Sequence, residues 1–213
     1  MSVQLIITDH DGVIADIGDL VYCAAWNLCS RHNLFGSIPT PPFTDFLEKF
    51  RLPGGEWFAS HGFDFPLEVV TETLRHAPNN AKMFSAVPLM LKTLRDRCPK
   101  LPIIMISAGD EPRIEGQLGK WGIRRYFDKV IGNILSKTEA IYFFCLAFGI
   151  NPKEAVYIGD MPSDMEHGCE AGVMTIGFTD DRPMMRRILT AAGAKHCVSN
   201  HQALGDLLLE LVA

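Results

Sequence analysis

Short apolar segments rich in β-branched residues alternate along this chain with longer stretches that have helical spacing. Turn residues bound the segments, which is typical of buried strands. The segments are residues 3–8, 101–107, 155–158, 173–177 and, more weakly, 195–199. Alternation of strand and helix predicts a mostly parallel sheet covered by helices on both faces. We therefore expect a three-layer, Rossmann-like α/β core.

Residues 17–84 interrupt this alternation. Their spacing is mainly helical, no convincing strand occurs in them, and they hold more than half of the chain's Phe, Trp and Tyr residues. Aromatic side chains at such a density can pack a small core of their own. We predict an inserted α-helical cap domain over residues 17–84, with residues 1–16 and 85–213 forming the catalytic core. An elaborated crossover that lies flat on the sheet is the alternative.

Composition limits the classes of partner. Hydrophobic residues make up 47% of the 213 residues and charged residues 21%, which is typical of a folded chain. A net charge of -5 without long runs of like charge argues against nucleic acid and anionic membranes as partners. The six cysteines lack zinc-type spacing, and neither a signal peptide nor a membrane span is predicted. We expect a cytoplasmic monomer or homodimer that acts on a small molecule.

Two aspartates, Asp9 and Asp11, follow the first predicted strand directly. Alternation along an extended segment would put both carboxylates on one side, with His10 pointing away. Two such charges 4 Å apart repel each other by about 4 kcal/mol at an effective dielectric of 20, unless a cation or a proton lies between them. By itself the pattern is also typical of a solvated turn, so its place at a strand end is what makes it a candidate site.

A second acidic pair, Asp160 and Asp164, follows the strand predicted at 155–158. In a parallel sheet both acidic loops leave at the carboxyl edge, where ligands bind in this architecture. Converging carboxylate oxygens suit Mg²⁺, which takes one or two carboxylates and leaves its other positions to water and phosphate oxygens. Alone, the pair is equally consistent with a helix N-cap.

Two further segments are weak signals when taken alone. Ser107, Ala108 and Gly109 end the strand predicted at 101–107 and could form an ordinary strand-to-helix turn. Lys137 stands at the start of a predicted helix, where lysines are usually solvated. Their order along the chain relative to the aspartates is what makes them candidate site residues.

Together these segments resemble the four motifs of the haloacid dehalogenase superfamily of phosphotransferases. The motif Asp-x-Asp-x-Thr/Val is matched by residues 9–13, the second motif by Ser107, the third by Lys137, and Gly-Asp-x-x-x-Asp by residues 159–164. The resemblance spans essentially the whole chain and is to phosphoglycolate phosphatase-like members with a helical type-1 cap. The chain departs from the family pattern at two places: relatives often have Asn where this chain has Ala108, and no Pro follows Lys137. Both departures concern substrate details rather than the chemistry.

This resemblance implies a Mg²⁺-dependent phosphatase that hydrolyses a small phosphorylated metabolite through an aspartyl-phosphate. Asp9 would be the nucleophile, and Asp11 would protonate the leaving oxygen and then deprotonate water. The dehalogenases of the family lack a carboxylate at the second position, so Asp11 favours phosphoryl transfer. Mg²⁺ would be held by Asp9, the backbone carbonyl of Asp11 and Asp160, with Asp164 orienting metal waters or Lys137.

The resemblance also implies how the phosphate is held. Ser107 and the amides of Ala108 and Gly109 would donate to phosphate oxygens, and Lys137 would add positive charge. Arg51, in a flexible turn of the cap, is the candidate for a cap side chain that enters the site. An interhelical loop with an exposed arginine is an equally good interpretation of that segment.

Other functions remain open on the sequence alone. A phosphomutase of the same family would return the phosphoryl group to its sugar. A phosphoacceptor signalling module would also place Asp, Ser and Lys at strand ends, but Asp11 would shorten the life of its aspartyl-phosphate. A dinucleotide-dependent oxidoreductase is disfavoured because no GxGxxG follows the first strand.

Overall fold

The computed structural model of the chain describes residues 2–17, 20–33, 36, 38–39, 41–51, 54–134 and 136–213. The chain divides into two compact units. One unit is formed by Met1–Asp16 with Met83–Ala213, and the other by Ile17–Lys82. The predicted site residues, except Arg51, belong to the first unit.

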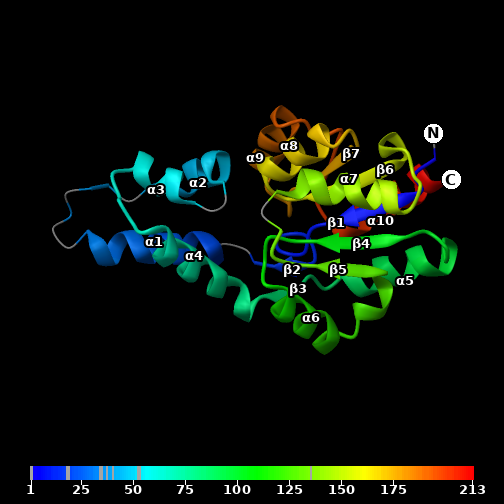
Figure 1. The fold of residues 1–213 in the computed structure, drawn as a ribbon, viewed down its shortest axis with the longest axis horizontal. Helices are drawn as coiled ribbons and strands as arrows, with labels where there is room; N and C mark the ends of the chain where they lie inside the picture. The colour runs from blue at the N-terminus through cyan, green and yellow to red at the C-terminus, as the bar shows by residue number, and fades with distance from the viewer. Residues whose placement is uncertain are drawn as a thin grey trace. The chain divides into compact units, whose positions relative to one another are not determined.

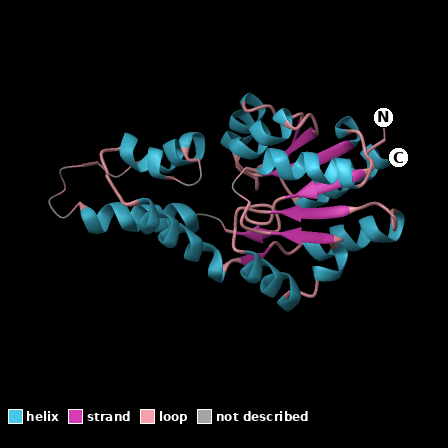
Figure 2. Cartoon of the chain, viewed as in Figure 1, coloured by secondary structure: helices cyan, strands magenta, loops and turns pink. Residues whose placement is uncertain are grey.

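A six-stranded sheet forms the centre of the first unit (Figure 1 and Figure 2). Its strands are β1 (Leu5–Thr8), β4 (Ile103–Ile106), β5 (Lys129–Ile131), β6 (Ala155–Gly159), β7 (Met174–Phe178) and β8 (His196–Val198). They lie in the order β5-β4-β1-β6-β7-β8, and every pairing is parallel. The predicted parallel sheet is thereby confirmed.

Helices cover both faces of this sheet. They are α5 (Val87–Arg97), α6 (Glu111–Lys120), α7 (Lys137–Ala147), α8 (Pro162–Glu170), α9 (Pro183–Ala191) and α10 (His201–Val212). Successive residues of β1 face opposite layers. Ile6 packs with residues of α5, α6 and α10, whereas Leu5 and Ile7 pack with residues of α7. The structure therefore has the three-layer α/β core that the sequence predicts.

The two-residue strands β2 (Ala15–Asp16) and β3 (Lys82–Met83) form a second, two-stranded sheet. Lys82–Met83 falls in the segment for which no strand is predicted. Two residues are too short to show any periodicity in the sequence.

The second unit is helical. Its helices are α1 (Leu20–His32), α2 (Phe43–Lys49), α3 (Gly55–Ser60) and α4 (Leu67–His76). Its core is aromatic: Phe46 stacks on Phe50 with ring centroids 4.4 Å apart, and Trp57 meets Phe46 edge-on at 5.3 Å. The indole N–H of Trp57 donates to Asp45, so this large ring is buried with its polar atom satisfied. The unit thus has a hydrophobic core of its own.

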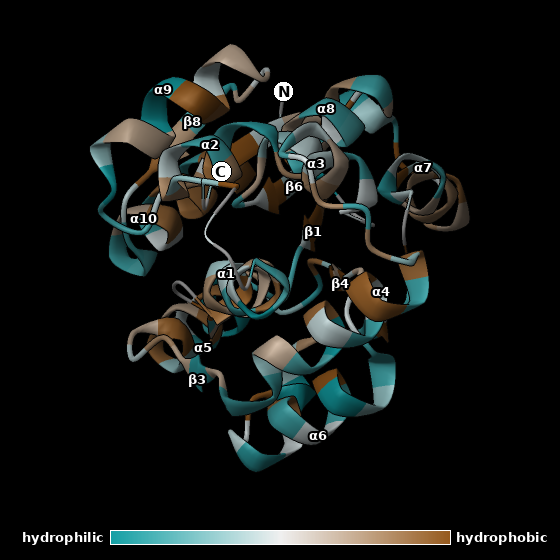
Figure 3. Cartoon of the chain, turned by 90° about the vertical axis from the view of Figure 1, so that its left-hand side faces the viewer, coloured by the Kyte–Doolittle hydropathy of each residue, from teal (hydrophilic) through white to brown (hydrophobic). Residues whose placement is uncertain are grey.

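Helix α7 carries apolar residues around much of its circumference, and Figure 3 shows it mostly in hydrophobic colours. Ile141 and Phe144 are buried, but Tyr142, Phe143 and Leu146 are more than half exposed. No helix formed by the described residues is long and apolar enough to cross a membrane.

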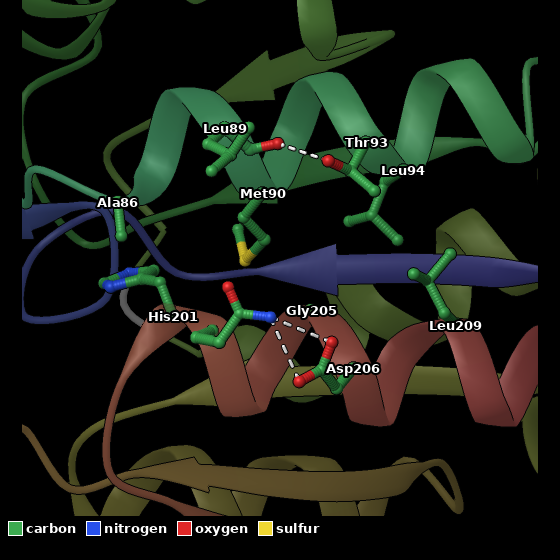
Figure 4. Close-up of a pocket in the computed structure, with 10 residues that line it drawn as sticks. Ala86, Leu89, Met90, Thr93, Leu94, His201, Gly205, Asp206 and Leu209 are labelled. Carbon is green, nitrogen blue, oxygen red and sulfur yellow. Dashed lines mark hydrogen bonds between the residues drawn. The ribbon is translucent and has the colours of Figure 1, made fainter.

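A pocket lies between α5 and α10 (Figure 4). Met90 and Leu94 line it from α5, and His201 and Leu209 from α10. His201 is buried, and its Nε2 donates to the backbone carbonyl of Val13 at 2.7 Å. None of the predicted site residues lines this pocket.

Candidate active site

Three of the predicted segments follow neighbouring strands of the sheet. β4 and β6 flank β1 on its two sides, and all three strands run in the same direction. Asp9 follows β1, Ser107 follows β4 and Asp160 follows β6. Because parallel strands end at the same edge, these residues start from one edge of the sheet.

The structure brings four charged side chains together at this edge, of which those of Asp9, Lys137 and Asp164 are buried and that of Asp160 is partly buried. Carboxylate oxygens of Asp9, Asp160 and Asp164 lie within 4.8 Å of one another. Lys137, the first residue of α7, donates from Nζ to Asp9 Oδ2 at 2.5 Å and to Asp164 Oδ1 at 2.7 Å. Lys137 is only 5% exposed. Three carboxylates thus face one ammonium group, which leaves an excess of negative charge in a buried place.

This crowding shifts the pKa values of the charged groups in the cluster. Burial raises the pKa of Asp9 to about 6, with the charge of Asp164 adding to the rise and Lys137 opposing it. Burial and the charge of Asp164 hold the pKa of Asp160 well above its ordinary range. For Lys137, burial disfavours the charge, but Asp164 and Asp9 outweigh it and raise the pKa of the ammonium group. A bound cation would relieve this repulsion.

The oxygen donors and the local backbone both fit a small hard cation such as Mg²⁺. Gly12 has a φ of +79°, and a Cβ on it would lie 1.9 Å from a carboxylate oxygen of Asp160. Only glycine therefore lets the turn after β1 approach Asp160 this closely. Asp9 and Asp160 have the chemistry and proximity to share one ion.

Asp164 is held by four donors of the protein. Its Oδ1 accepts from Lys137 and from the hydroxyl of Tyr157 at 2.8 Å. Its Oδ2 accepts from the amides of Asp160 and Met161. Because an ionised carboxylate offers about four lone-pair sites, these donors occupy the group. This arrangement suits a residue that positions Lys137 and the Asp160 loop.

Removing the Tyr157 hydroxyl should lower stability. Tyr157 is fully buried, and its hydroxyl donates to a charged acceptor, so Tyr157→Phe is expected to cost about 1–2 kcal/mol of unfolding free energy. Urea unfolding followed by circular dichroism measures this loss. Tyr142→Phe is the matched control, because Tyr142 is 57% exposed and should leave the midpoint unchanged. Equal midpoints for wild type and Tyr157→Phe would contradict the assignment of this bond.

Asp11 is bound to a different set of groups. The chain turns immediately after Asp9: the amides of Ile14 and Ala15 both donate to the carbonyl of His10. The extended alternation expected there ends at the strand, and the expectation that His10 points away from Asp11 is wrong. His10 is fully buried and its Nδ1 donates to Asp11 Oδ1 at 2.9 Å.

Arg113 holds the same carboxylate with two hydrogen bonds. Its Nη1 donates to Asp11 Oδ1 at 3.0 Å and its Nη2 to Asp11 Oδ2 at 2.6 Å. Burial alone would raise the pKa of Asp11, but the hydrogen bonds from His10 and Arg113 outweigh burial and lower it to about 2. Asp11 is therefore ionised near neutral pH.

The loop after β4 presents a small polar surface. Ser107 is buried, and its Oγ accepts from the amide of Gly109 at 3.2 Å. Gly109 also lies against Asp11: a Cβ there would be 3.0 Å from Asp11 Oδ2 and 2.1 Å from Arg113 Nη2. The Ser107–Gly109 loop and Asp11 are therefore neighbours, and binding of phosphate by Ser107, Ala108 and Gly109 stays a prediction.

Arg51 belongs to the second unit. Its Nη1 donates to the backbone carbonyls of Glu48 and Phe50. Leu52 and Pro53 of the loop predicted to enter the site lie outside the described residues. A role for Arg51 at the site stays a prediction.

Sequence reasoning missed Arg113, Tyr157 and the contact of His10 with Asp11. Arg113 is the third residue of α6, whose N-cap is Asp110. Side chains in a helix tilt toward its N-terminus, so a long residue in the first turn can reach back to the strand ends. That rule could have identified Arg113, whereas Tyr157 carries no signal because a buried strand accepts any large apolar ring.

Comparison with known proteins yields one family and consistent structural neighbours. The family model described as "Haloacid dehalogenase-like hydrolase" matches residues 6–178. A curated relative, "Putative pyrophosphatase PpaX" of Clostridium perfringens, is 34% identical over 185 residues, which cover 82% of this chain and 83% of the relative.

Solved structures agree on the fold. A predicted phosphatase from Clostridium acetobutylicum has a TM-score of 0.76 at 18% identity, with 99% of this chain and 100% of that chain covered. A predicted phosphoglycolate phosphatase from Haemophilus somnus has a TM-score of 0.69 at 14% identity, with 97% of this chain and 98% of that chain covered. At these identities the likeness concerns the fold alone.

Proposed function

Because the chain belongs to the haloacid dehalogenase-like hydrolase family, we propose that it is a Mg²⁺-dependent phosphatase of a small phosphorylated metabolite. The observation that carries the proposal is the cluster in which the carboxylates of Asp9, Asp160 and Asp164 lie close together and Lys137 binds two of them, Asp9 and Asp164. The second unit, Ile17–Lys82, would act as the cap that selects the leaving group.

In the proposed reaction, Asp9 is the nucleophile. One of its carboxylate oxygens attacks phosphorus and the bond from phosphorus to the substrate oxygen breaks. The leaving oxygen takes a proton from Asp11, which must first have received that proton from solvent because free Asp11 is ionised. Water then attacks the aspartyl-phosphate, Asp11 takes its proton, and the bond from phosphorus to Asp9 breaks to release phosphate. The second step needs Asp11 as the carboxylate that the structure contains.

The remaining residues would hold the anionic groups. Asp9, Asp160 and the backbone carbonyl of Asp11 would hold Mg²⁺, and Asp164 would keep Lys137 in place. Mg²⁺ supplies positive charge that offsets the repulsion between the carboxylate and the phosphate. Lys137 neutralises part of the charge on the transferring group, and donors of the Ser107–Gly109 loop bind its oxygens.

A screen for phosphate release tests the proposal. Phosphorylated metabolites are incubated with the protein and Mg²⁺, with the Asp9→Asn protein as the blank. Pyrophosphate and phosphoglycolate are included because a relative and a structural neighbour carry those names. Metal-dependent phosphate release that the blank lacks is the expected result. Isomerised sugar phosphate without free phosphate would establish a mutase, and an aspartyl-phosphate stable for many minutes would favour a signalling module.

Binding of Mg²⁺ should be visible in the absence of any substrate. A ligand at about 100 times its dissociation constant adds about 2.7 kcal/mol to stability, which is about 5–10 °C in melting temperature for a chain of this size. We expect this rise for wild type and its loss in Asp160→Asn. Asp96→Asn, on an exposed ion pair of α5, is the control that should keep the rise. An unchanged rise in Asp160→Asn would place the ion elsewhere.

A further inference from the structure

Arg113 is a charged residue in an unfavourable place for stability alone. It lies in the first turn of α6, where the helix dipole disfavours a cation. Its side chain is only 9% exposed, and its Nε is buried without a partner among the described residues. A buried donor without an acceptor lowers stability. Arg113 therefore needs a compensating interaction, and its two hydrogen bonds to Asp11 supply it.

These bonds fix the orientation of the Asp11 carboxylate. A guanidinium that donates to both oxygens sets the plane as well as the position of a carboxylate, which a single donor does not. His10 adds a third contact at 2.9 Å, and its ring stacks on Trp121 with a centroid distance of 5.8 Å. Both donors are thus anchored in buried surroundings, and Asp11 has little freedom to turn.

The orientation is toward the loop that follows β4. Asp11 Oδ2 lies against Gly109, where the absence of a Cβ leaves room for Arg113 Nη2. Any side chain at this position would displace the guanidinium. The chain thus keeps the Asp11–Arg113 pair next to the loop that would bind phosphate.

We propose that Arg113 is a positioning residue for the reaction, which acts by holding the Asp11 carboxylate beside the Ser107–Gly109 loop. The inference rests on the proposed function, because it requires Asp11 to transfer protons. Asp11 would then meet the leaving oxygen or the attacking water without first having to be ordered. Arg113 itself touches neither.

A double-mutant cycle on phosphate release tests this role. Acid–base groups contribute about 10²–10⁴-fold to a rate, and loss of orientation should forfeit part of this. Arg113→Met is expected to lower kcat by about 10–100-fold and to leave KM within about 3-fold of the wild-type value. Arg113→Lys keeps one donor group, so its kcat should lie between those of Arg113→Met and wild type. In an Asp11→Asn background, which has no proton to transfer, Arg113→Met should lower kcat no further.

Controls separate positioning from general damage. Arg124→Met removes another guanidinium that binds a carboxylate of α6, Glu115, at 2.7 Å, and it should leave kcat unchanged. The rise in melting temperature with Mg²⁺ reports whether each variant retains the metal site.

Three results would overturn the role: equal losses of kcat in both backgrounds, no loss in either Arg113 variant, or an equal loss in Arg124→Met. Absence of phosphate release by wild type would instead overturn the proposed function, so the two failures are distinguishable.

Discussion

Replacing Asp9 by Asn is expected to reduce phosphate release by at least about 10³-fold while the chain stays folded. The amide oxygen of Asn is a poor nucleophile and cannot form the aspartyl-phosphate. The substitution also removes one negative ligand from the proposed ion site. Initial rates of phosphate release at saturating Mg²⁺ measure the loss, and Asp96→Asn provides a matched surface control.

Stability gives this experiment an independent readout. The pKa of Asp9 is raised to about 6, so the folded state binds this proton more tightly than the unfolded chain does. The free energy of unfolding therefore falls as pH rises from about 4 to about 6, because Asp9 loses its proton less readily in the folded state than in the unfolded chain. In metal-free buffer at pH 7–8, Asp9→Asn should unfold at a urea concentration no lower than wild type. A variant that loses activity and also unfolds much earlier would indicate that Asp9 acts mainly in folding.

Replacing Lys137 by Met should damage both stability and activity. Lys137 is buried between Asp9 and Asp164, so its removal leaves buried carboxylates without their cation. Breaking a buried ion pair in this way costs about 3–5 kcal/mol. Urea unfolding in metal-free buffer measures that cost, and added Mg²⁺ should recover part of it because the ion replaces positive charge.

Activity of Lys137→Met should stay about 10²-fold below wild type even with Mg²⁺, because the ion does not supply the donor to the transferring group. Lys129→Met is the matched control: Lys129 is exposed on β5, and its loss should change stability by no more than about 0.5 kcal/mol. An unfolding midpoint equal to that of wild type would show that Lys137 does not hold the carboxylates.

The sequence is sufficient to predict five of the six strands of the sheet, because buried strands appear in it as apolar runs. β1, β4, β6, β7 and β8 all fall within one or two residues of the predicted segments. β5 is missing from the prediction. It has three residues, its first, Lys129, is exposed, and Ile131 is only partly buried, so its pattern does not stand out from that of a loop.

The cluster of Asp9, Asp160, Asp164 and Lys137 could also be predicted, because each residue follows from its place at a strand or helix end. The surroundings of Asp11 could not. The turn that contains Gly12 begins directly after Asp9. Side chains in this turn therefore do not alternate between two sides as they do along an extended strand. Arg113 comes from a helix far along the sequence, so nothing local to Asp11 indicates it; only the reach of long side chains from the first turn of a helix could have suggested it.

The central place of β1 has a consequence for synthesis of the protein. Of the strands in this sheet, β1 is translated first, yet Ile6 finds its partners only when Ile103 and Val156 have been translated. Closing such distant pairs is slow compared with forming helices. A nascent chain that ends before β6 holds Asp9 next to a strand whose apolar edge is unpaired, without Asp160 or Asp164. Prematurely terminated products should therefore lack the complete Asp9–Asp160–Asp164 cluster and be prone to aggregate through the unpaired edge of β1.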